Sequence, residues 1–146
     1  MNILYIGFIR GNCKLTLYSL RKIHQNVDYI NTKKILPFHN FSYRLFYHVH
    51  PKLFEKYLDF FFYRKIKKKY DLIFINNSEF ITNKVLDYLK RKSKKILFYM
   101  CDNPFVNRDK KRWFFFKNNS KKYDLIVFQQ KSRLKFAKKH GLKKYI

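Results

Sequence analysis

Two carboxylates are the residues of this sequence best suited to acid–base chemistry. Glu79 follows an apolar run that ends at residue 75, and Asp102 directly follows another run that ends at Cys101. A carboxylate at the end of a strand can have its pKa tuned by its neighbours and can then accept a proton from a substrate. Each has a simpler interpretation, Glu79 as a first-turn charge that favours a helix dipole and Asp102 as a turn former before Pro104. The residues alone leave both interpretations open.

Side-chain amides follow two copies of one hexapeptide. Lys-Lys-Tyr-Asp-Leu-Ile occurs at 68–73 and again at 121–126, and each copy opens an apolar run. The first run ends in Asn76 and Asn77, and the second ends in Gln129 and Gln130. Amides both donate and accept hydrogen bonds, which suits sugar hydroxyls and similar polyols, although they are also common turn formers. The sequence predicts substrate-binding roles for Asn77 and Gln130, and also for Asn103, which follows Asp102.

A glycine-containing turn follows the first apolar run, at residues 2–9. Gly7 and Gly11 are spaced Gly-x-x-x-Gly and Asn12 follows them. Such a turn at a helix N-terminus can cradle phosphate or let a substrate approach the backbone. The sequence has neither GxGxxG nor GxxxxGK[ST], so dinucleotide or Walker-type binding is not expected. We therefore expect Gly7, Gly11 and Asn12 to line a substrate site, and we predict no cofactor.

The histidines and cysteines give little indication of a metal site or of a disulfide framework. His39, His48 and His50 are close in sequence, but no cysteine or carboxylate accompanies them in a metal-ligand spacing, so no metal is predicted. Cys13 and Cys101 are too few for a disulfide framework and lack CxxC spacing. The favoured interpretation is two reduced thiols in a cytoplasmic protein.

Alternating strand and helix patterns position these residues. Continuous apolar runs predict strands at 2–9, 27–30, 71–75, 95–101 and 124–128, and the start of one more at 142–146. Helical patterns fall between them at about 15–26, 81–91, 108–117 and 132–140, with Thr82 or Ser78 as a possible N-cap and Gly141 as a C-terminal stop. This order predicts an α/β, Rossmann-like domain with a mainly parallel sheet and helices on both faces. The carboxyl ends of its strands would share one rim, where the candidate residues would meet.

Residues 37–66 interrupt the alternation and form a predicted helical aromatic insert. Pro51 is well placed to start a helix, after which five apolar residues fall at helical spacing: Phe54, Tyr57, Leu58, Phe61 and Phe62. One interpretation is an aromatic face packed on the sheet. The other is a helix whose aromatic and lysine-rich sides meet a membrane interface.

The formal net charge of +25 first suggests a nucleic acid or an anionic membrane as partner. Lysine outnumbers arginine 26 to 8, whereas proteins that read phosphates usually recruit the bidentate fork of arginine, so nucleic acid is an unlikely partner and an anionic membrane surface a better one. No uncharged stretch approaches the ~20 residues that span a bilayer, and the N-terminus has no signal-peptide pattern. We expect a cytoplasmic protein that can be peripheral on the inner face of the membrane.

Taken together, the motifs resemble the N-terminal half of GT-B-fold glycosyltransferases, most closely the spore-maturation-type and family 1-like group. The resemblance covers nearly the whole chain. It rests on a strand at the N-terminus, the Gly-x-x-x-Gly turn, Tyr-Asp-Leu-Ile leading to Ser78-Glu79-Phe80, the run K-I-L-F-Y-M-C-D-N-P-F, and a second Tyr-Asp-Leu followed by a helix and Gly-Leu-Lys-Lys. The tetrapeptide at 102–105 is its most specific part.

The resemblance implies a single acceptor-side domain at residues 1–146, without the C-terminal domain that binds a nucleotide-sugar donor in this family. It implies sugar transfer to a hydroxyl acceptor such as a cell-envelope glycan or glycolipid, and an isolated chain that is inactive without the donor-binding domain. Gly11, Asn12, Glu79, Asp102 and Asn103 would line the acceptor side of the cleft. Two other functions remain open, a non-catalytic Rossmann-like binding or regulatory module and a basic nucleic-acid-binding protein.

Overall fold

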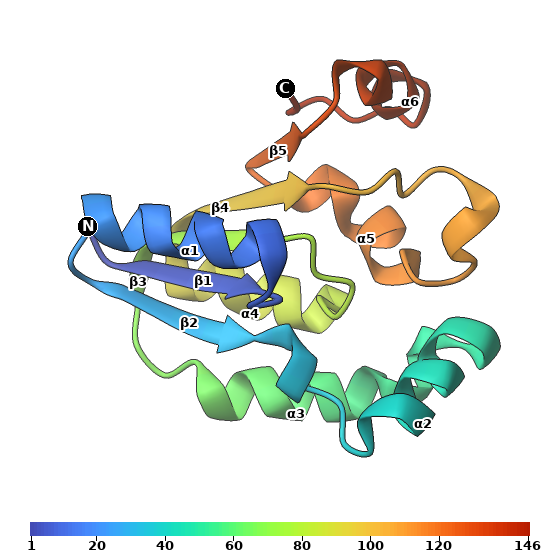
Figure 1. Ribbon diagram of the computed structural model, residues 1–146, viewed down its shortest axis with the longest axis horizontal. Helices are drawn as coiled ribbons and strands as arrows, with labels where there is room; N and C mark the ends of the chain where they lie inside the picture. The colour runs from blue at the N-terminus through green and yellow to red at the C-terminus, as the bar shows by residue number, and fades with distance from the viewer.

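Five parallel strands form one sheet in the computed structural model, which describes the backbone of residues 1–146 and every side chain except those of His39 and Asn107. The strands are β1 (Ile3–Gly7), β2 (Val27–Asn31), β3 (Tyr70–Asn76), β4 (Ser93–Met100) and β5 (Leu125–Phe128). Their order is β2-β1-β3-β4-β5 (Figure 1). The order reverses between β1 and β3, and in open parallel sheets ligands bind outside the carboxyl ends of the strands at such a point.

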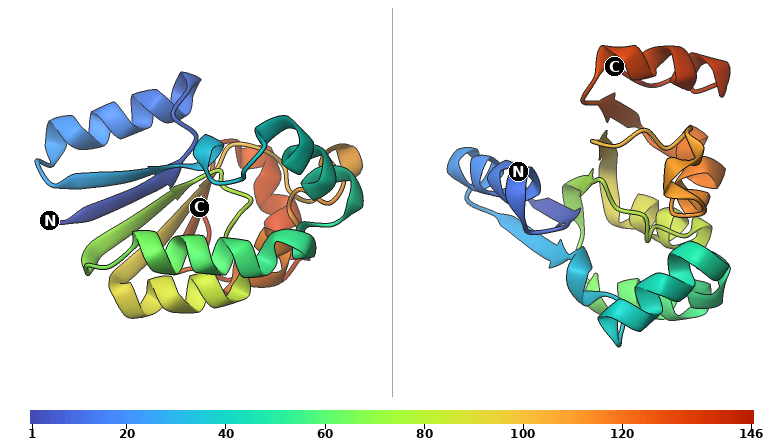
Figure 2. Two further views of the ribbon diagram at one scale, coloured as in Figure 1. Left: turned by 90° about the horizontal axis from the view of Figure 1, so that it is seen from below. Right: turned by 45° about the vertical axis from the view of Figure 1, so that its right-hand side comes forward.

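Helices cover both faces of this sheet, so the predicted Rossmann-like α/β fold is confirmed. Helix α1 (Gly11–Ile23) lies on one face, where Leu17 joins a small core with Ile3, Tyr5 and Val27. The other face carries the larger core and is covered by α3 (Glu55–Lys65), α4 (Asn83–Lys92) and α5 (Phe114–Asn119) (Figure 2). Alternate residues of β1 face the two cores, which explains why the strand reads as a continuous apolar run.

The aromatic insert is a chain of short helical segments beside β2. A 3₁₀ turn (Thr32–Lys34) leads to α2 (His39–Arg44), a π-helical turn (Leu45–Val49), a second 3₁₀ turn (Pro51–Phe54) and then α3. Leu58 and Phe62 are fully buried, so packing on the sheet is confirmed for this stripe of α3. Another stripe stays open to solvent, because Phe60 is 62% exposed. Among the described residues, no helix has the length and apolar character needed to cross a bilayer.

Local signals explain where several helices begin and end. Thr82, rather than Ser78, caps α4 by accepting a hydrogen bond from the backbone N–H of Val85 at 3.0 Å. Gly141, with φ of 67°, follows α6 (Leu134–Lys139) in the left-handed conformation that glycine adopts most easily. The helix predicted at 108–117 is wrong in extent, because Lys110 has a φ of 49° and separates a 3₁₀ turn (Asn107–Asp109) from α5.

The C-terminal residues, where the pattern predicts the start of one more strand, form an isolated bridge along the outer edge of β5. Tyr145 forms a parallel bridge with Ile126. The Ile126 N–H donates to the carbonyl of Lys144 at 2.9 Å, and the Ile146 N–H donates back to the carbonyl of Ile126 at 3.0 Å. This short pairing gives the edge strand β5 a partner on its otherwise open side.

Candidate functional site

The carboxyl ends of β1 and β3 lie side by side, where Gly7 is in register with Asn76. A Cβ atom on Gly7 would lie 2.9 Å from the ring of Tyr5 and 3.0 Å from Cβ of Asn76. The Asn76 amide, which is buried, donates to the Tyr5 hydroxyl at 2.9 Å, and that hydroxyl donates to the carbonyl of Cys13 at 2.7 Å. Gly7 is therefore needed for close packing of this hydrogen-bonded layer, below the rim itself.

Asn77 joins the end of β3 to the end of β4. Its side-chain oxygen accepts from the backbone N–H groups of Cys101, at 3.1 Å, and Asp102, at 3.3 Å. Its side-chain nitrogen donates to the Asp102 carboxylate at 3.0 Å. Asn77 has a φ of 51°, a conformation that asparagine tolerates better than most residues. Through this one side chain the two predicted strand-end turns form a single unit.

Glu79 is buried at the rim although it carries a carboxylate. The Tyr47 hydroxyl donates to its Oε1 at 2.5 Å, and Arg112 Nη2 lies 3.6 Å from its Oε2. Tyr47 comes from the π-helical turn of the insert, and Arg112 comes from the segment before α5. The carboxylate is thus held between two segments that are far apart in the sequence.

Arg112 connects the two predicted acid–base candidates. Its Nη1 donates to Asp102 Oδ2 at 3.1 Å, while its other terminal nitrogen faces Glu79. Its guanidinium lies 4.5 Å from the ring centroid of Trp113, a favourable cation–π distance. Burial opposes the positive charge, but Glu79, Tyr47 and Asp102 together keep the pKa of Arg112 above its ordinary value. Two carboxylates and one permanent cation therefore form a fixed charged cluster.

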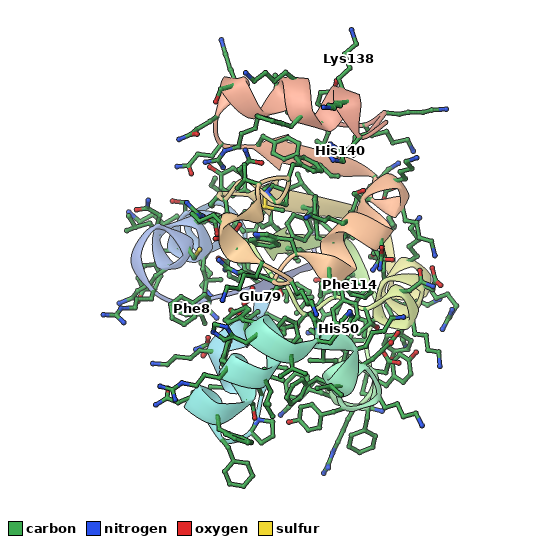
Figure 3. The ribbon with its side chains drawn as sticks, turned by 90° about the vertical axis from the view of Figure 1, so that its right-hand side faces the viewer. Phe8, His50, Glu79, Phe114, Lys138 and His140 are labelled. Carbon is green, nitrogen blue, oxygen red and sulfur yellow. The ribbon has the colours of Figure 1, made fainter. Side chains whose placement is uncertain are left out.

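A pocket of about 240 Å³ opens beside this cluster. Its lining combines aromatic, amide, thiol and charged groups: Phe8, Cys13, Thr32, Tyr43, Tyr47, Asn77, Glu79 and Arg112. Figure 3, which looks onto the carboxyl rim, shows Phe8 and Glu79 between α1 and the helical insert. The volume is below the roughly 300–1,000 Å³ of pockets for drug-sized ligands, so one small polar unit fits.

Two tyrosines of the pocket are held as neutral hydroxyls. Burial, reinforced by the charge of Glu79, raises the pKa of both Tyr43 and Tyr47 well above the ordinary value for tyrosine. Tyr47 is accordingly a hydrogen-bond donor to Glu79 at neutral pH. The fixed Glu79 carboxylate can accept a further hydrogen bond from a ligand hydroxyl, while aromatic faces offer apolar contact.

The structure brings together three of the eight predicted site residues: Asn77, Glu79 and Asp102. Of these three, Asn77 and Glu79 line the pocket and Asp102 lies behind Arg112; the remaining five do not line it. Gly11 and Asn12 are exposed at the start of α1, and Gln130 is exposed after β5. Asn103 accepts from the N–H of Phe105 at 3.1 Å, a local turn, and Gly7 lies in the packed layer described above. Substrate contacts by these five remain predictions.

Several site residues gave no signal in the sequence. Arg112 lies in a basic stretch beside Lys110 and Lys111, where nothing distinguishes it from solvent-exposed charges. Tyr47 is one of many aromatics in the insert. Cys13 could have been suspected only from its place in the first turn of the first helix, where a thiol can be activated.

Larger hollows at the amino ends of the strands are weaker candidates. One of about 550 Å³ is lined by lysines and by Asp28, whose carboxylate is 2.6 Å from Lys68. Another of about 410 Å³ contains Asp71, which is 2.7 Å from Lys94. Both carboxylates are surface ion pairs, whereas Glu79 at the carboxyl rim is buried beside a topological switch point. We therefore place the candidate site at the rim.

Among the described side chains, no three His, Cys, Asp or Glu residues gather as metal ligands. His48 instead lies 3.1 Å from the Lys110 amine, and the ring of His50 lies 4.6 Å from that of Phe114. The side chain of His39, the third histidine of the sequence cluster, is outside the described residues.

Comparisons with protein-family models and with curated proteins found no match for this chain, so its resemblance to glycosyltransferases stays a prediction.

Proposed function

We propose that the chain is the acceptor-side domain of a GT-B-type glycosyltransferase, and that the pocket beside Glu79 receives the acceptor sugar or polyol. One observation carries the proposal: a buried carboxylate, fixed by Tyr47 and Arg112, lines a small pocket at the switch point of a parallel sheet. The aromatic rings and the Asn77 amide beside it match the mixed apolar and hydroxyl surface of a sugar.

In the transfer reaction, an acceptor hydroxyl would attack the anomeric carbon of a nucleotide sugar bound by a second domain facing this rim. The bond from that carbon to the donor's diphosphate breaks as the new glycosidic bond forms. Glu79 would orient the attacking hydroxyl and take its proton, and Asp102 is the second candidate for this role. The Arg112 charge, shared between both carboxylates, would keep them in place.

A non-catalytic binding module is the second candidate function. It is favoured by the ion pairs of both carboxylates with the same arginine, an arrangement that also suits a rigid recognition site. The two functions share the pocket and differ in whether a proton is transferred there. Nucleic-acid binding has only the net charge of +25 in its support.

Acceptor binding can be tested on the purified chain by NMR titration with a panel of neutral mono- and disaccharides. We expect shifts of the backbone signals of Cys13, Asn77 and Glu79, and at least a tenfold loss of affinity in Glu79→Gln, which corresponds to about 1.4 kcal/mol. Glu55→Gln is the matched control, since Glu55 is the only other glutamate and lies outside the pocket. A panel in which no saccharide shifts these signals would exclude the proposed acceptor site.

Turnover separates the transferase from the binding module. With nucleotide-sugar donors and the domain that binds them, Glu79→Gln or Asp102→Asn should lower turnover by about 10²–10⁴-fold, the usual contribution of a positioned base. If both variants keep the turnover of the parent protein, neither carboxylate is the base. If saccharides bind but no donor supports transfer, the binding module is the better description.

We further propose that the helical insert brings the acceptor pocket to an anionic membrane that carries a lipid-linked acceptor. Four apolar side chains of this segment are more than 60% exposed: Phe38, Phe41, Leu53 and Phe60. Exposed lysines lie among them, at Lys52 and Lys56 for example. Aromatic side chains beside basic residues are the pattern of surfaces that bind anionic lipid interfaces.

Vesicle co-sedimentation tests this surface. We expect the chain to pellet with anionic vesicles at low salt, and Phe38→Ser with Phe41→Ser to reduce the bound fraction several-fold. Leu15→Ser with Tyr18→Ser on α1 removes exposed apolar side chains from another surface and should leave binding unchanged. Equal losses from both double variants, or binding to neither neutral nor anionic vesicles, would rule out the insert as a membrane contact.

A further inference from the structure

The only two cysteines of the chain meet at the carboxyl rim, although 87 residues separate them in sequence. Cys13 is in the first turn of α1, and Cys101 directly follows β4. Their sulfur atoms lie 3.5 and 3.7 Å from the same atom, the side-chain oxygen of buried Asn76. The fold therefore holds both thiols against one oxygen atom above the switch point.

The two thiols are chemically unequal. The neighbouring Cys101 thiol lowers the pKa of Cys13, against the opposing effects of burial and of the Asp102 charge, with help from Tyr5 and Arg112. The neighbouring Cys13 thiol, together with burial, raises the pKa of Cys101. Cys13 is also near the N-terminus of a 13-residue helix, a position that favours a thiolate. Cys13 is thus the more nucleophilic of the two thiols.

Small molecules can reach the pair. Both cysteines are half-buried, and Cys13 lines the 240 Å³ pocket with Glu79 and Arg112. A hydroperoxide is small enough to enter a pocket of this volume. Disulfides that form in reducing compartments are usually transient and redox-sensing rather than structural. Redox-sensing cysteines typically combine an accessible thiolate with a second thiol nearby, as Cys13 and Cys101 do here.

We propose that Cys13 and Cys101 are a reversible redox pair that is oxidised by hydroperoxides to an intramolecular disulfide across Asn76. The Cys13 thiolate attacks one peroxide oxygen, so the O–O bond breaks, Cys13 becomes a sulfenic acid and the other oxygen leaves as hydroxide or alkoxide. The Cys101 sulfur then attacks the sulfur of Cys13, and hydroxide leaves and is protonated by the Cys101 proton to give water. Two thiols lose two electrons in total, and the peroxide gains them.

Oxidation would alter the pocket directly. The disulfide ties the start of α1 to the end of β4 and removes the Cys13 thiol from the wall that it shares with Glu79. It also removes both thiols as hydrogen-bond donors to Asn76. The redox pair does not depend on the proposed sugar transfer, because it rests only on where the fold places the two sulfurs.

The test uses the purified, reduced chain at low concentration with one equivalent of hydrogen peroxide. We expect the intact mass to fall by two hydrogen atoms, a peptide map to link Cys13 with Cys101, and dithiothreitol to reverse both. Before oxidation, iodoacetamide should alkylate Cys13 at least about tenfold faster than Cys101 at neutral pH. In denaturant this preference should disappear, which serves as the control for an effect of the fold.

Single-cysteine variants identify the order of events. In Cys101→Ser, peroxide should leave a sulfenic acid on Cys13 that dimedone captures, whereas Cys13→Ser should give at most slow labelling of Cys101. Three outcomes would overturn the proposal: oxygen addition without a disulfide, disulfides only between chains, or equal alkylation rates of the two folded-state thiols. The alkylation comparison on the parent chain keeps the test decisive if either variant folds poorly.

Discussion

The two copies of Lys-Lys-Tyr-Asp-Leu-Ile have identical sequences and different surroundings. The first copy leads into β3, a seven-residue strand in the middle of the sheet between β1 and β4. The second leads into β5, a four-residue strand at the edge. The aspartate has the same local role in both copies, because Asp71 accepts from the backbone N–H of Asn2 and Asp124 from that of Ile96, each at 2.8 Å. The hexapeptide thus specifies how a strand starts and joins its neighbour.

The two copies differ in what surrounds their later residues. Asn76 and Asn77, after the first copy, are the centre of the hydrogen-bonded rim. Gln129 and Gln130, at the equivalent positions after the second copy, are exposed to solvent. A central parallel strand has a neighbouring strand on both sides, so its carboxyl end meets the ends of β1 and β4, whereas β5 has one neighbouring strand and only a short bridge to the C-terminal residues on its other side. Position in the sheet, rather than local sequence, makes one amide pair part of the candidate site.

The largest expected difference between the copies is at Asn77 and Gln130. Asn77→Ala should lower the free energy of unfolding by about 2–4 kcal/mol, because alanine in the left-handed conformation is strained and three side-chain hydrogen bonds are lost. Asn77→Gly keeps the conformation and should recover part of the loss. Gln130→Ala should change stability by less than about 0.5 kcal/mol. Chemical denaturation measures the free energy of unfolding of all three variants. Comparable losses for Asn77→Ala and Gln130→Ala would contradict the proposed difference between the central and the edge strand.

The tyrosines of the two copies should respond with opposite signs. The Tyr70 hydroxyl donates to Asp28 at 2.9 Å, while the Tyr123 hydroxyl is buried between Phe98 and Phe116 and has no hydrogen-bond partner among the described residues. Tyr70→Phe should lower the free energy of unfolding by about 1 kcal/mol, and Tyr123→Phe should raise it by a similar amount, since it removes an unpaired polar group. Thermal or urea unfolding of the two variants measures the sign of each change in the free energy of unfolding. A destabilised Tyr123→Phe would mean that this hydroxyl has a partner in solution.

The smallest expected effect is the pH dependence that comes from Asp71. A hydrogen bond from Lys94, and a second from the Asn2 N–H, lower the pKa of this carboxyl in the folded chain. A lowered folded-state pKa stabilises the fold at pH values above the unfolded-state pKa, near 3.9, and this stabilisation disappears as the pH falls through the folded-state value. Asp71→Asn should therefore flatten the acid side of the stability profile. Unfolding curves between neutral and strongly acidic pH, at low and high salt, measure this; an unchanged profile would show that the ion pair is fully screened.

The fold could be predicted from the sequence because each strand, helix and helix end is indicated by residues within a few positions of one another. Continuous apolar runs of strand length, separated by helical patterns, gave the alternation and the parallel sheet, and Thr82 and Gly141 marked helix ends through their own conformational preferences. The helix predicted at 108–117 failed where a single residue, Lys110, adopts a left-handed conformation that its type does not announce.

The same reasoning found only part of the candidate site. Glu79 and Asp102 were recognisable because they follow strands, and the parallel sheet then placed them at one rim. Their connection through Arg112, and the closure of the pocket by Tyr47, could not be predicted, because they depend on contacts between segments that are far apart in the sequence.

By itself the sequence determined the strands, their direction and the rim to which their polar ends are delivered, because hydrophobic periodicity and helix caps act over a few residues. Only the tertiary structure decided which of two identical hexapeptides lies at the centre, which carboxylate is buried against Tyr47, and that Cys13 and Cys101 touch the same amide oxygen. Those outcomes depend on contacts between residues far apart in the chain, and their energies arise only when the sheet and its helices have packed.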